Sequence, residues 1–220
     1  MFIELVDTLR CLNDHEDTWL VAAVERFEGR YIDRGSLGCP VCRAEYRIER
    51  GAADFRASRG AWAVDATAPF SGVAMPADTL RDEVLRVRAL LDLREHGGTI
   101  VLTGAAAVLA APLEDELDLH VLVVNPGPDV ALNAGRSTLL VDGRVPLARE
   151  SIRGAVAGED QAAGAILADL ASALRAGGRL VGPASVAVTA GVQELARDDR
   201  QWVGVKRDVT SRLVTIGQRR

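Results

Sequence analysis

The chain has 220 residues, of which 48% are hydrophobic, and it carries a net charge of -5 at pH 7 with a pI near 5.3. This length suffices for a substantial core and a small additional module, as in a soluble globular protein. The acidic balance disfavours non-specific binding to nucleic acid or anionic lipid. The longest apolar run, 99–113, is too short and too rich in alanine for a transmembrane helix, and residues 1–10 do not resemble a signal peptide. We therefore expect a cytoplasmic protein.

Three cysteines in a chain without an export signal argue against a disulfide framework and favour metal or redox chemistry. Cys11 and His15 stand at C-x3-H spacing, and Cys39 and Cys42 form a C-x-x-C pair flanked by turn-forming residues. Three thiolates and one imidazole complete a tetrahedral structural zinc site that leaves no position for water. The spacing therefore predicts that these four residues bind zinc.

Two other interpretations of the C-x-x-C pair are open. A thioredoxin-like redox pair begins a helix after a strand, whereas residues 43–51 have the pattern of a strand, with Tyr46 and Ile48 on one face. In the other interpretation, Cys11 and His15 are simply buried, and the C-x-x-C is a turn without metal.

The first 55 residues resemble a known family. The stretch 29–55, GRYIDRGSLGCPVCRAEYRIERGAADF, with "LRC" upstream of it, is similar to the short zinc-ribbon proteins that stabilise tRNA and release-factor methyltransferases, and to the same ribbon fused to bacterial methyltransferases. The match covers about residues 5–55. The family usually has a second cysteine where this chain has His15. The resemblance implies a zinc-ribbon domain over residues 1–52, with structural zinc.

Residues 53–79 lack a steady hydrophobic period and are rich in small and turn-forming residues. This composition is typical of a connector. We expect it to pack on a neighbouring surface through Phe55, Trp62 and Phe70.

From Leu80 onward, helical and strand patterns alternate. Residues 80–98 predict an amphipathic helix that stops at the glycine pair 97–98, and 160–178 predict a second helix with a similar stop. Buried strands are predicted over 99–104, 119–127, 137–143, 154–160 and 179–183. Residues 200–220 have the pattern of two adjacent strands. The alternation predicts a doubly wound parallel sheet with a hairpin at its edge.

This order resembles class I S-adenosylmethionine-dependent methyltransferases over about residues 80–217. The stretch 166–181, ILADLASALRAGGRLV, is similar to the family's helix, glycine turn and strand, and 139–156 is similar to its acidic residue, Leu-Pro pair and substrate-side strand. The resemblance implies a methyltransferase-like domain over residues 80–220. It also implies an α/β, Rossmann-like methyltransferase fold, mainly a parallel sheet with a C-terminal antiparallel hairpin, preceded by the small zinc ribbon.

The resemblance places S-adenosylmethionine against Gly104, Asn125 and Asp142. Gly104 is the single glycine kept from the family's G-x-G-x-G loop, and Thr103 stands where an acidic residue is common. Asn125 replaces a carboxylate that accepts the ribose hydroxyls, which removes charge-assisted hydrogen bonds worth roughly 1 kcal/mol or more each. Asp142 matches the residue at the adenine edge, although an aspartate before glycine is also an ordinary turn residue.

A third departure is Gly154, where the family often has aspartate. His96 and His120, at a helix end and a strand start, are more typical of capping or packing residues. We therefore predict no catalytic residue.

Two functions compete. Three weakened positions in one pocket favour a non-catalytic scaffold or accessory subunit of a larger protein assembly, for which Trp19, Trp62 and Trp202 are either partner anchors or packing residues. The alternative is an active S-adenosylmethionine-dependent methyltransferase acting on a small molecule or a protein, because methyl transfer to a good nucleophile needs mainly alignment and desolvation. We expect a protein partner, and the acidic charge argues against a nucleic-acid partner.

Overall fold

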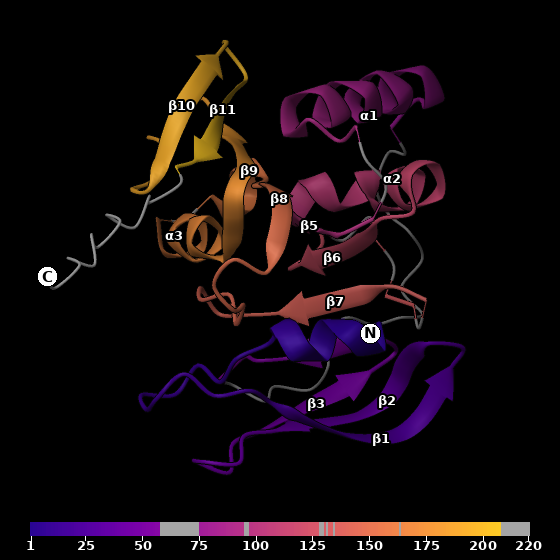
Figure 1. The fold of residues 1–220 in the computed structure, drawn as a ribbon. Coiled ribbons are helices and arrows are strands. Elements are labelled where there is room, and N and C mark those ends of the chain that lie inside the picture. Colours follow the sequence, from indigo (N-terminus) through magenta and orange to yellow (C-terminus); the bar gives the residue numbers. More distant parts are fainter. Residues whose placement is uncertain are drawn as a thin grey trace, which may run out of the picture.

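Figure 1 shows the computed structural model, in which residues 1–57, 75–94, 97–127, 130, 132–133, 135–162 and 164–207 are described. The helical elements are η1 (Ile3–Thr8), α1 (Ala77–Leu91), η2 (Gly104–Leu109), α2 (Ala110–Leu117), η3 (Glu159–Gln161) and α3 (Gly164–Ala173). The strands are β1 (Val21–Glu28), β2 (Tyr31–Gly38), β3 (Glu45–Glu49), β4 (Ala52–Asp54), β5 (Thr99–Thr103), β6 (His120–Val124), β7 (Ser137–Leu140), β8 (Ile152–Val156), β9 (Leu174–Pro183), β10 (Val192–Arg197) and β11 (Gln201–Lys206). Within these residues, no helix has the length and apolar character needed to span a bilayer.

The strands of the described residues form one sheet, in the order β1-β2-β3-β4-β7-β6-β5-β8-β9-β11-β10. Strands β1 to β4 form an antiparallel meander in which each strand pairs with the next. Strand β4 then pairs in parallel with β7, and parallel pairing continues through β6, β5, β8 and β9. The segment predicted as a zinc ribbon and the segment predicted as an α/β unit therefore share one continuous sheet.

The strand order confirms the predicted Rossmann-like methyltransferase fold. From β5 the parallel strands are added first on one side, as β6 and β7, and then on the other, as β8 and β9. The reversal lies between β5 and β8, the kind of position where open α/β sheets bind ligands. At the far edge, β11 runs antiparallel to both β9 and β10. The mainly parallel sheet thus ends in an antiparallel hairpin, as predicted, although the hairpin is formed by partly different residues.

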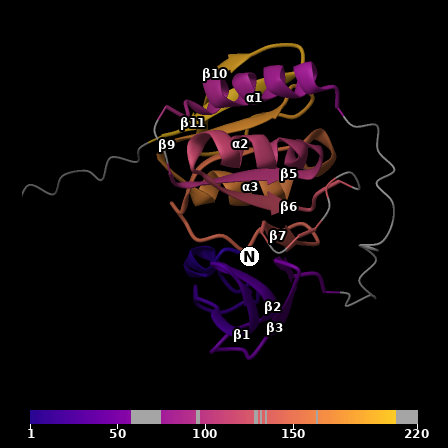
Figure 2. The same ribbon diagram turned by 90° about the vertical axis from the view of Figure 1, so that its right-hand side faces the viewer.

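The central strands are buried on both faces, because almost all their residues are apolar. On β6, Leu122 and Val124 contribute to one buried cluster, and the alternate residues Val121 and Val123 contribute to the other. Helix α3 packs on the first face, and helices α1 and α2 pack on the second (Figures 1 and 2). The parallel strands therefore lie between these two helical layers.

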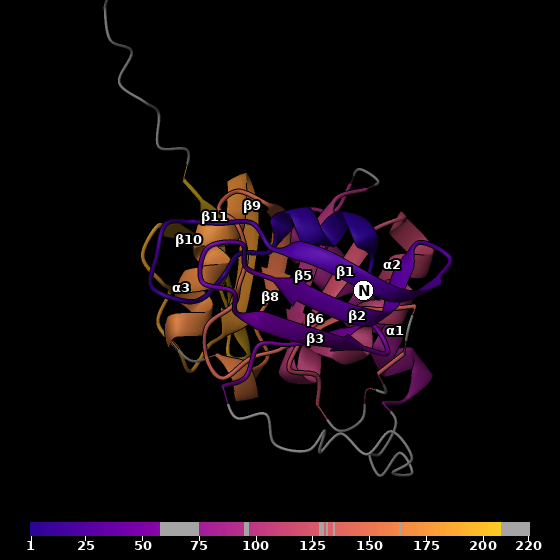
Figure 3. The same cartoon turned by 90° about the horizontal axis from the view of Figure 1, so that it is seen from below.

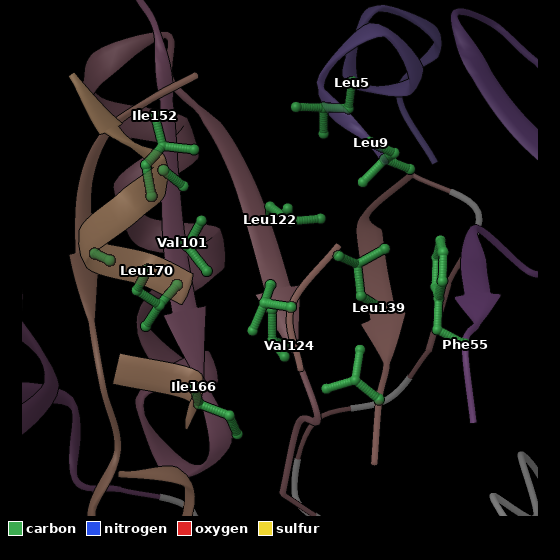
Figure 4. Close-up of a cluster of buried hydrophobic side chains, with 14 of the residues drawn as sticks. Leu5, Leu9, Phe55, Val101, Leu122, Val124, Leu139, Ile152, Ile166 and Leu170 are labelled. Carbon is green, nitrogen blue, oxygen red and sulfur yellow. The ribbon is translucent and has the colours of Figure 1, made fainter. Parts of the chain in front are cut away.

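The N-terminal segment covers part of the face that α3 covers. Leu5 of η1 and Leu9 just after it are 2% and 0% exposed, and they belong to the same cluster as Leu122 and Leu139 (Figure 4). An antiparallel bridge between Leu9 and Leu147 fixes this segment on the β7–β8 connection. Seen from below, η1 and strands β1 to β3 lie in front of the central strands (Figure 3). The N-terminal segment thus completes the core of the α/β unit.

Two predicted helix ends are corrected by the structure. The helix predicted to reach Gly97 ends at Leu91, because Asp92 adopts a left-handed conformation with φ of 55° and its backbone N–H donates to Ala89 O and Arg88 O. Helix α3 ends at Ala173, and β9 begins at the next residue, before the predicted stop at the glycine pair 177–178.

The C-terminal hairpin begins earlier than predicted. It is formed by β10 and β11, whereas the sequence pattern placed both strands after residue 199. The predicted last strand lies outside the described residues, as do most of the connector, Trp62, Phe70 and His96. Strand β10 was not predicted because five of its six residues are exposed and its apolar residues do not alternate regularly with polar ones.

Candidate zinc site and candidate cofactor pocket

The structure brings Cys11, His15, Cys39 and Cys42 together beyond the end of β2. Their ligand atoms all lie within 4.8 Å of one another. Cys11 Sγ is 3.6 Å from Cys42 Sγ, and Cys39 Sγ is 3.4 Å from His15 Nε2. With Zn–S bonds of about 2.3 Å and Zn–N bonds of about 2.0–2.1 Å, tetrahedral ligands lie roughly 3.5–3.8 Å apart. Both the donor set and these two spacings fit a zinc ion.

A tight turn places both cysteines of the C-x-x-C pair on the same side of the chain. The Cys39 N–H donates to Ala44 O at 2.8 Å, and the Arg43 N–H donates to Cys39 O at 2.9 Å. Arg43 has a φ of 61°, which closes the turn and leads directly into strand β3. The helix that a thioredoxin-like redox pair would begin is therefore replaced by a strand.

The histidine is oriented for ligation by its second ring nitrogen. His15 Nδ1 lies 2.7 Å from the backbone carbonyl oxygen of Glu16, so this nitrogen carries the proton and donates it. The lone pair of Nε2 then points toward the sulfur of Cys39. Such an outer hydrogen bond fixes the tautomer in many metal sites.

Neighbouring groups also act on the thiols. The backbone hydrogen bond from Ala44, with a smaller contribution from Asn13 Nδ2 at 3.2 Å, lowers the pKa of Cys42 to about 6, which favours the thiolate that binds metal. Burial raises the pKa of Cys11, while the Tyr46 hydroxyl, 3.4 Å from its sulfur, lowers it. No sequence pattern marks Asn13 and Tyr46 as partners of the thiols, although Asn13 lies between Cys11 and His15 in the chain.

The first loop of the candidate cofactor pocket is occupied by another part of the chain. Gly104 follows β5 with a φ of 55°, and a Cβ at this position would collide with the carboxylate of Asp160 on η3. The same carboxylate accepts a hydrogen bond from the Ala105 N–H at 3.1 Å. The Gly158 N–H donates to Thr103 Oγ1, also at 3.1 Å. The β8–α3 connection therefore covers the loop that would face a cofactor.

The side chain of Asn125, at the carboxyl end of β6, makes three hydrogen bonds with other residues of the chain. Its Nδ2 donates to Val141 O at 3.0 Å and to Gln161 Oε1 at 2.9 Å, while its Oδ1 accepts from the Val141 N–H at 2.9 Å. Both protons of the amide are used, so none is left for a ligand. Two adjacent residues, Asp160 and Gln161, thus contact the two loop positions that the resemblance assigned to the cofactor.

The other predicted positions have structural partners. Asp142 Oδ2 accepts a hydrogen bond from the Ala57 N–H at 2.7 Å, which ties the end of β4 to the end of β7. Gly154 lies inside β8, where a Cβ would be 3.3 Å from Leu91 Cδ2, so this residue faces α1 and is not at the rim of the pocket. The ring of His120 stacks on Phe2 with 3.9 Å between centroids, which makes it a packing residue.

The predicted tryptophan anchors differ in exposure. Trp202 is fully buried and its Nε1 donates to Val186 O, so it belongs to the core. Trp19 is 64% exposed, and the guanidinium of Arg10 lies 5.2 Å from its ring centroid. Of the two described tryptophans, only Trp19 is available to a partner.

A cavity of about 480 Å³ lies next to the covered loop. It is bordered by α1, by the loop after β5, by the ends of β8 and β9, and by the β10–β11 turn. Glu83 and Arg200 on its wall form an ion pair at 2.7 Å. The carboxyl edge of the sheet therefore keeps open space on the α1 side, while the space near Asn125 is filled by η3.

Comparisons with known proteins give structural likeness alone. No family model matches the chain, and no curated protein matches its sequence. A complex between the Haloferax volcanii Trm112 methyltransferase activator and a putative methyltransferase is similar at 15% identity and a TM-score of 0.43, over 58% of this chain and 91% of that one.

Two further structures are similar over shorter parts. Haemonchus contortus phosphoethanolamine N-methyltransferase 2, with S-adenosylhomocysteine, shares 15% identity at a TM-score of 0.40, over 54% of this chain and 30% of that one. Geranyl diphosphate C-methyltransferase from Streptomyces coelicolor A3(2) shares 18% identity at a TM-score of 0.39, over 48% of this chain and 45% of that one. The chain therefore spans less than half the length of these two enzymes.

Proposed function

We propose that this protein is a non-catalytic, methyltransferase-like scaffold with a structural zinc ion, serving as an accessory subunit of a larger protein assembly. The observation that carries the proposal is the filling of the candidate cofactor pocket by η3. The Asp160 carboxylate accepts a hydrogen bond from the Ala105 N–H of the first loop, and Gln161 Oε1 accepts one from Asn125 Nδ2. A cofactor at these positions has to break both hydrogen bonds.

Displacing η3 lowers the affinity for any cofactor. Each broken hydrogen bond costs about 0.5–1.5 kcal/mol, and the charge-assisted bonds that a carboxylate would give the ribose are absent at Asn125. Every 1.4 kcal/mol weakens binding about tenfold. Two such bonds and one missing charge therefore lower the affinity by roughly two to three orders of magnitude.

The zinc ion has a structural role in this proposal. With Cys11, His15, Cys39 and Cys42 as ligands, a tetrahedral ion has no open position for water or substrate. The three thiols are free, as expected for a protein of a reducing compartment, so we place the protein in the cytoplasm. The zinc-binding end of the molecule also carries Trp19, which we assign to contact with a protein partner.

The second candidate is an active S-adenosylmethionine-dependent methyltransferase acting on a small molecule or a protein. One observation favours it: the cavity of about 480 Å³ borders the first loop and has the size of a small-molecule site. In this alternative η3 moves away when the cofactor binds, and Gly104, Asn125 and Asp142 line the cofactor site.

Titration calorimetry of S-adenosylmethionine and S-adenosylhomocysteine into zinc-replete protein separates the two. The scaffold proposal expects no binding heat at millimolar ligand for the wild type, and weak binding in the double variant Asp160→Ala, Gln161→Ala. Glu159→Ala is the matched control, because this neighbouring residue makes neither contact. Micromolar binding by the wild type would overturn the proposal. Elution of the protein as a monomer from native lysate would contradict the part of the proposal that makes it a subunit of a larger assembly.

A further inference from the structure

A second cavity, of about 240 Å³, lies at the opposite edge of the sheet from the candidate cofactor pocket. It is lined by the residues after α1, by the start of β8 and by the turn within β9, namely Leu91, Asp92, Arg94, Arg153, Arg175, Ala176, Gly177 and Gly178. These segments stand at the amino ends of the central strands. The cavity is therefore separate from the carboxyl edge, where Gly104 and Asn125 lie.

Arginine dominates this cavity. Arg94, Arg153 and Arg175 line it from three different elements, and Asp92 is the single carboxylate among its described lining residues. Asp92 is already shared, because its carboxylate pairs with Arg94 Nε at 2.6 Å and with Arg179 Nη2 at 3.3 Å. The cavity thus concentrates positive charge in a chain whose net charge is -5.

The three arginines are arranged at different depths. Arg153 is 8% exposed, its Nη1 donates to Gly97 O at 3.1 Å, and its stem packs against Gly98, where a Cβ would lie 3.6 Å from Arg153 Cδ. Arg94 and Arg175 are exposed, and the Arg175 side chain makes no hydrogen bond or ion pair with the part of the chain that the structure describes. A fixed guanidinium at the wall and the unpaired guanidinium of Arg175 at the rim suit a small ligand that enters from solvent.

We propose that this cavity binds a small dianion of the phosphate or phosphomonoester class. Guanidinium groups present planar pairs of donors that match the oxygens of phosphate, and such charge-assisted bonds are about twice as strong as neutral ones. The volume of about 240 Å³ is below that of typical drug-sized pockets, so the ligand is a phosphoryl group with few further atoms. This site is independent of the scaffold or enzyme role of the other edge.

The test is calorimetric titration of the full zinc-loaded chain with inorganic phosphate and with glycerol 3-phosphate, at constant ionic strength in chloride. We expect saturable binding of at least one of the two, at millimolar concentration or below. Arg175→Gln should weaken it about tenfold, and Arg94→Gln with Arg175→Gln should weaken it further, because each change removes charge-assisted bonds. Arg34→Gln, at an exposed position of β2, is the control with the same loss of charge.

The two ligands distinguish the source of the phosphoryl group. Equal affinity for both assigns the site to free phosphate, and tighter binding of glycerol 3-phosphate assigns it to phosphorylated small molecules. The proposal is overturned if neither ligand saturates, if the double variant binds as the wild type does, or if Arg34→Gln loses as much affinity as Arg175→Gln. Because the rim arginines are exposed, these variants are expected to fold normally.

Discussion

The side chain of Asn125 both donates to and accepts from the backbone of Val141, and it donates to Gln161 as well. A carboxylate at this position only accepts, so it would face Val141 O and Gln161 Oε1 without a proton between them. Asparagine at this position, where the resemblance to methyltransferases leads one to expect an acidic residue, therefore has a local structural reason. The amide joins the ends of β6 and β7 and holds η3 over the pocket.

Glu114 on α2 is a second residue whose chemistry depends on its surroundings. Burial raises the pKa of its carboxyl to about 7, and Arg136, whose Nε lies 3.9 Å from Glu114 Oε2, opposes this shift. The folded state then binds a proton more tightly than the unfolded state. The contribution of Glu114 to stability therefore falls as the pH rises from about 4.5 to about 7.

We expect Glu114→Gln to remove this pH dependence. As the pH rises from 5 to 8, the wild type should lose stability relative to the variant, by about 1–3 kcal/mol in unfolding free energy. Urea denaturation of zinc-loaded protein at several pH values measures it, and the zinc ligands titrate alike in both proteins. A difference that stays constant with pH would show that Glu114 has an ordinary pKa when folded.

At the residue scale the sequence predicted which four candidate metal-binding side chains lie together, but it could not reveal how the candidate cofactor pocket is filled. Cysteine and histidine are rare in this chain, and their spacing alone groups Cys11, His15, Cys39 and Cys42. Asp160 and Gln161 are ordinary polar residues of the short helix η3. Their partners lie 55 and 36 residues away in the chain, so the contacts depend on the path of a loop that no local pattern encodes.

Among the elements, the turn between β3 and β4 determines how the N-terminal meander joins the parallel strands. Gly51 has a φ of 75°, and a Cβ there would lie 2.5 Å from Arg136 O and 2.9 Å from Asn133 O. Its carbonyl accepts a hydrogen bond from the Thr138 N–H of β7. The short strand β4 reaches β7 because this turn brings the two backbones so close together.

Gly51→Ala should therefore destabilise the protein by more than the backbone strain of a positive φ alone. Gly29→Ala is the matched control, because Gly29 has a φ of 60° but nothing within 4 Å of an added Cβ. We expect about 1 kcal/mol of destabilisation for Gly29→Ala and at least about 2 kcal/mol more for Gly51→Ala. Thermal or urea unfolding measures both losses of stability. Equal losses in the two variants would mean that the backbones around Gly51 can move apart to accommodate a methyl group.

Elements with strong periodicity were predictable, and those defined by pairing were not. The apolar runs of β5 to β7 and the amphipathic face of α1 are visible in the sequence. Strand β4 has three residues, and β10 is almost entirely exposed, so neither carries a hydrophobic pattern. These strands exist because a neighbouring strand offers hydrogen bonds, and a single sequence does not show which strands become neighbours.

At the scale of the whole molecule, one buried hydrophobic cluster contains residues from both predicted domains, the zinc ribbon and the α/β unit. Cys39 is 3% exposed and belongs to the same buried cluster as Leu37, Leu122 and Leu139. Leu9, which belongs to the same cluster, lies two residues before Cys11. A zinc ion bound as proposed by the four candidate metal ligands would therefore stabilise both the N-terminal segment and the face of the sheet that this segment covers.

We therefore expect removal of zinc to unfold both regions together. Structural zinc contributes about 10–16 kcal/mol in zinc-finger peptides, which is comparable to the whole stability of a typical domain at about 5–15 kcal/mol. Hydrogen exchange followed by mass spectrometry, with and without a chelator, should show lost protection in β1–β3 and also in β6 and β7. Cys42→Ser in zinc-containing buffer should reproduce this loss, because it removes one ligand from an exposed position. Retained protection in β6, β7 and α1 after chelation, with loss confined to residues 1–52, would contradict the shared core and identify the ribbon as a separate folding unit.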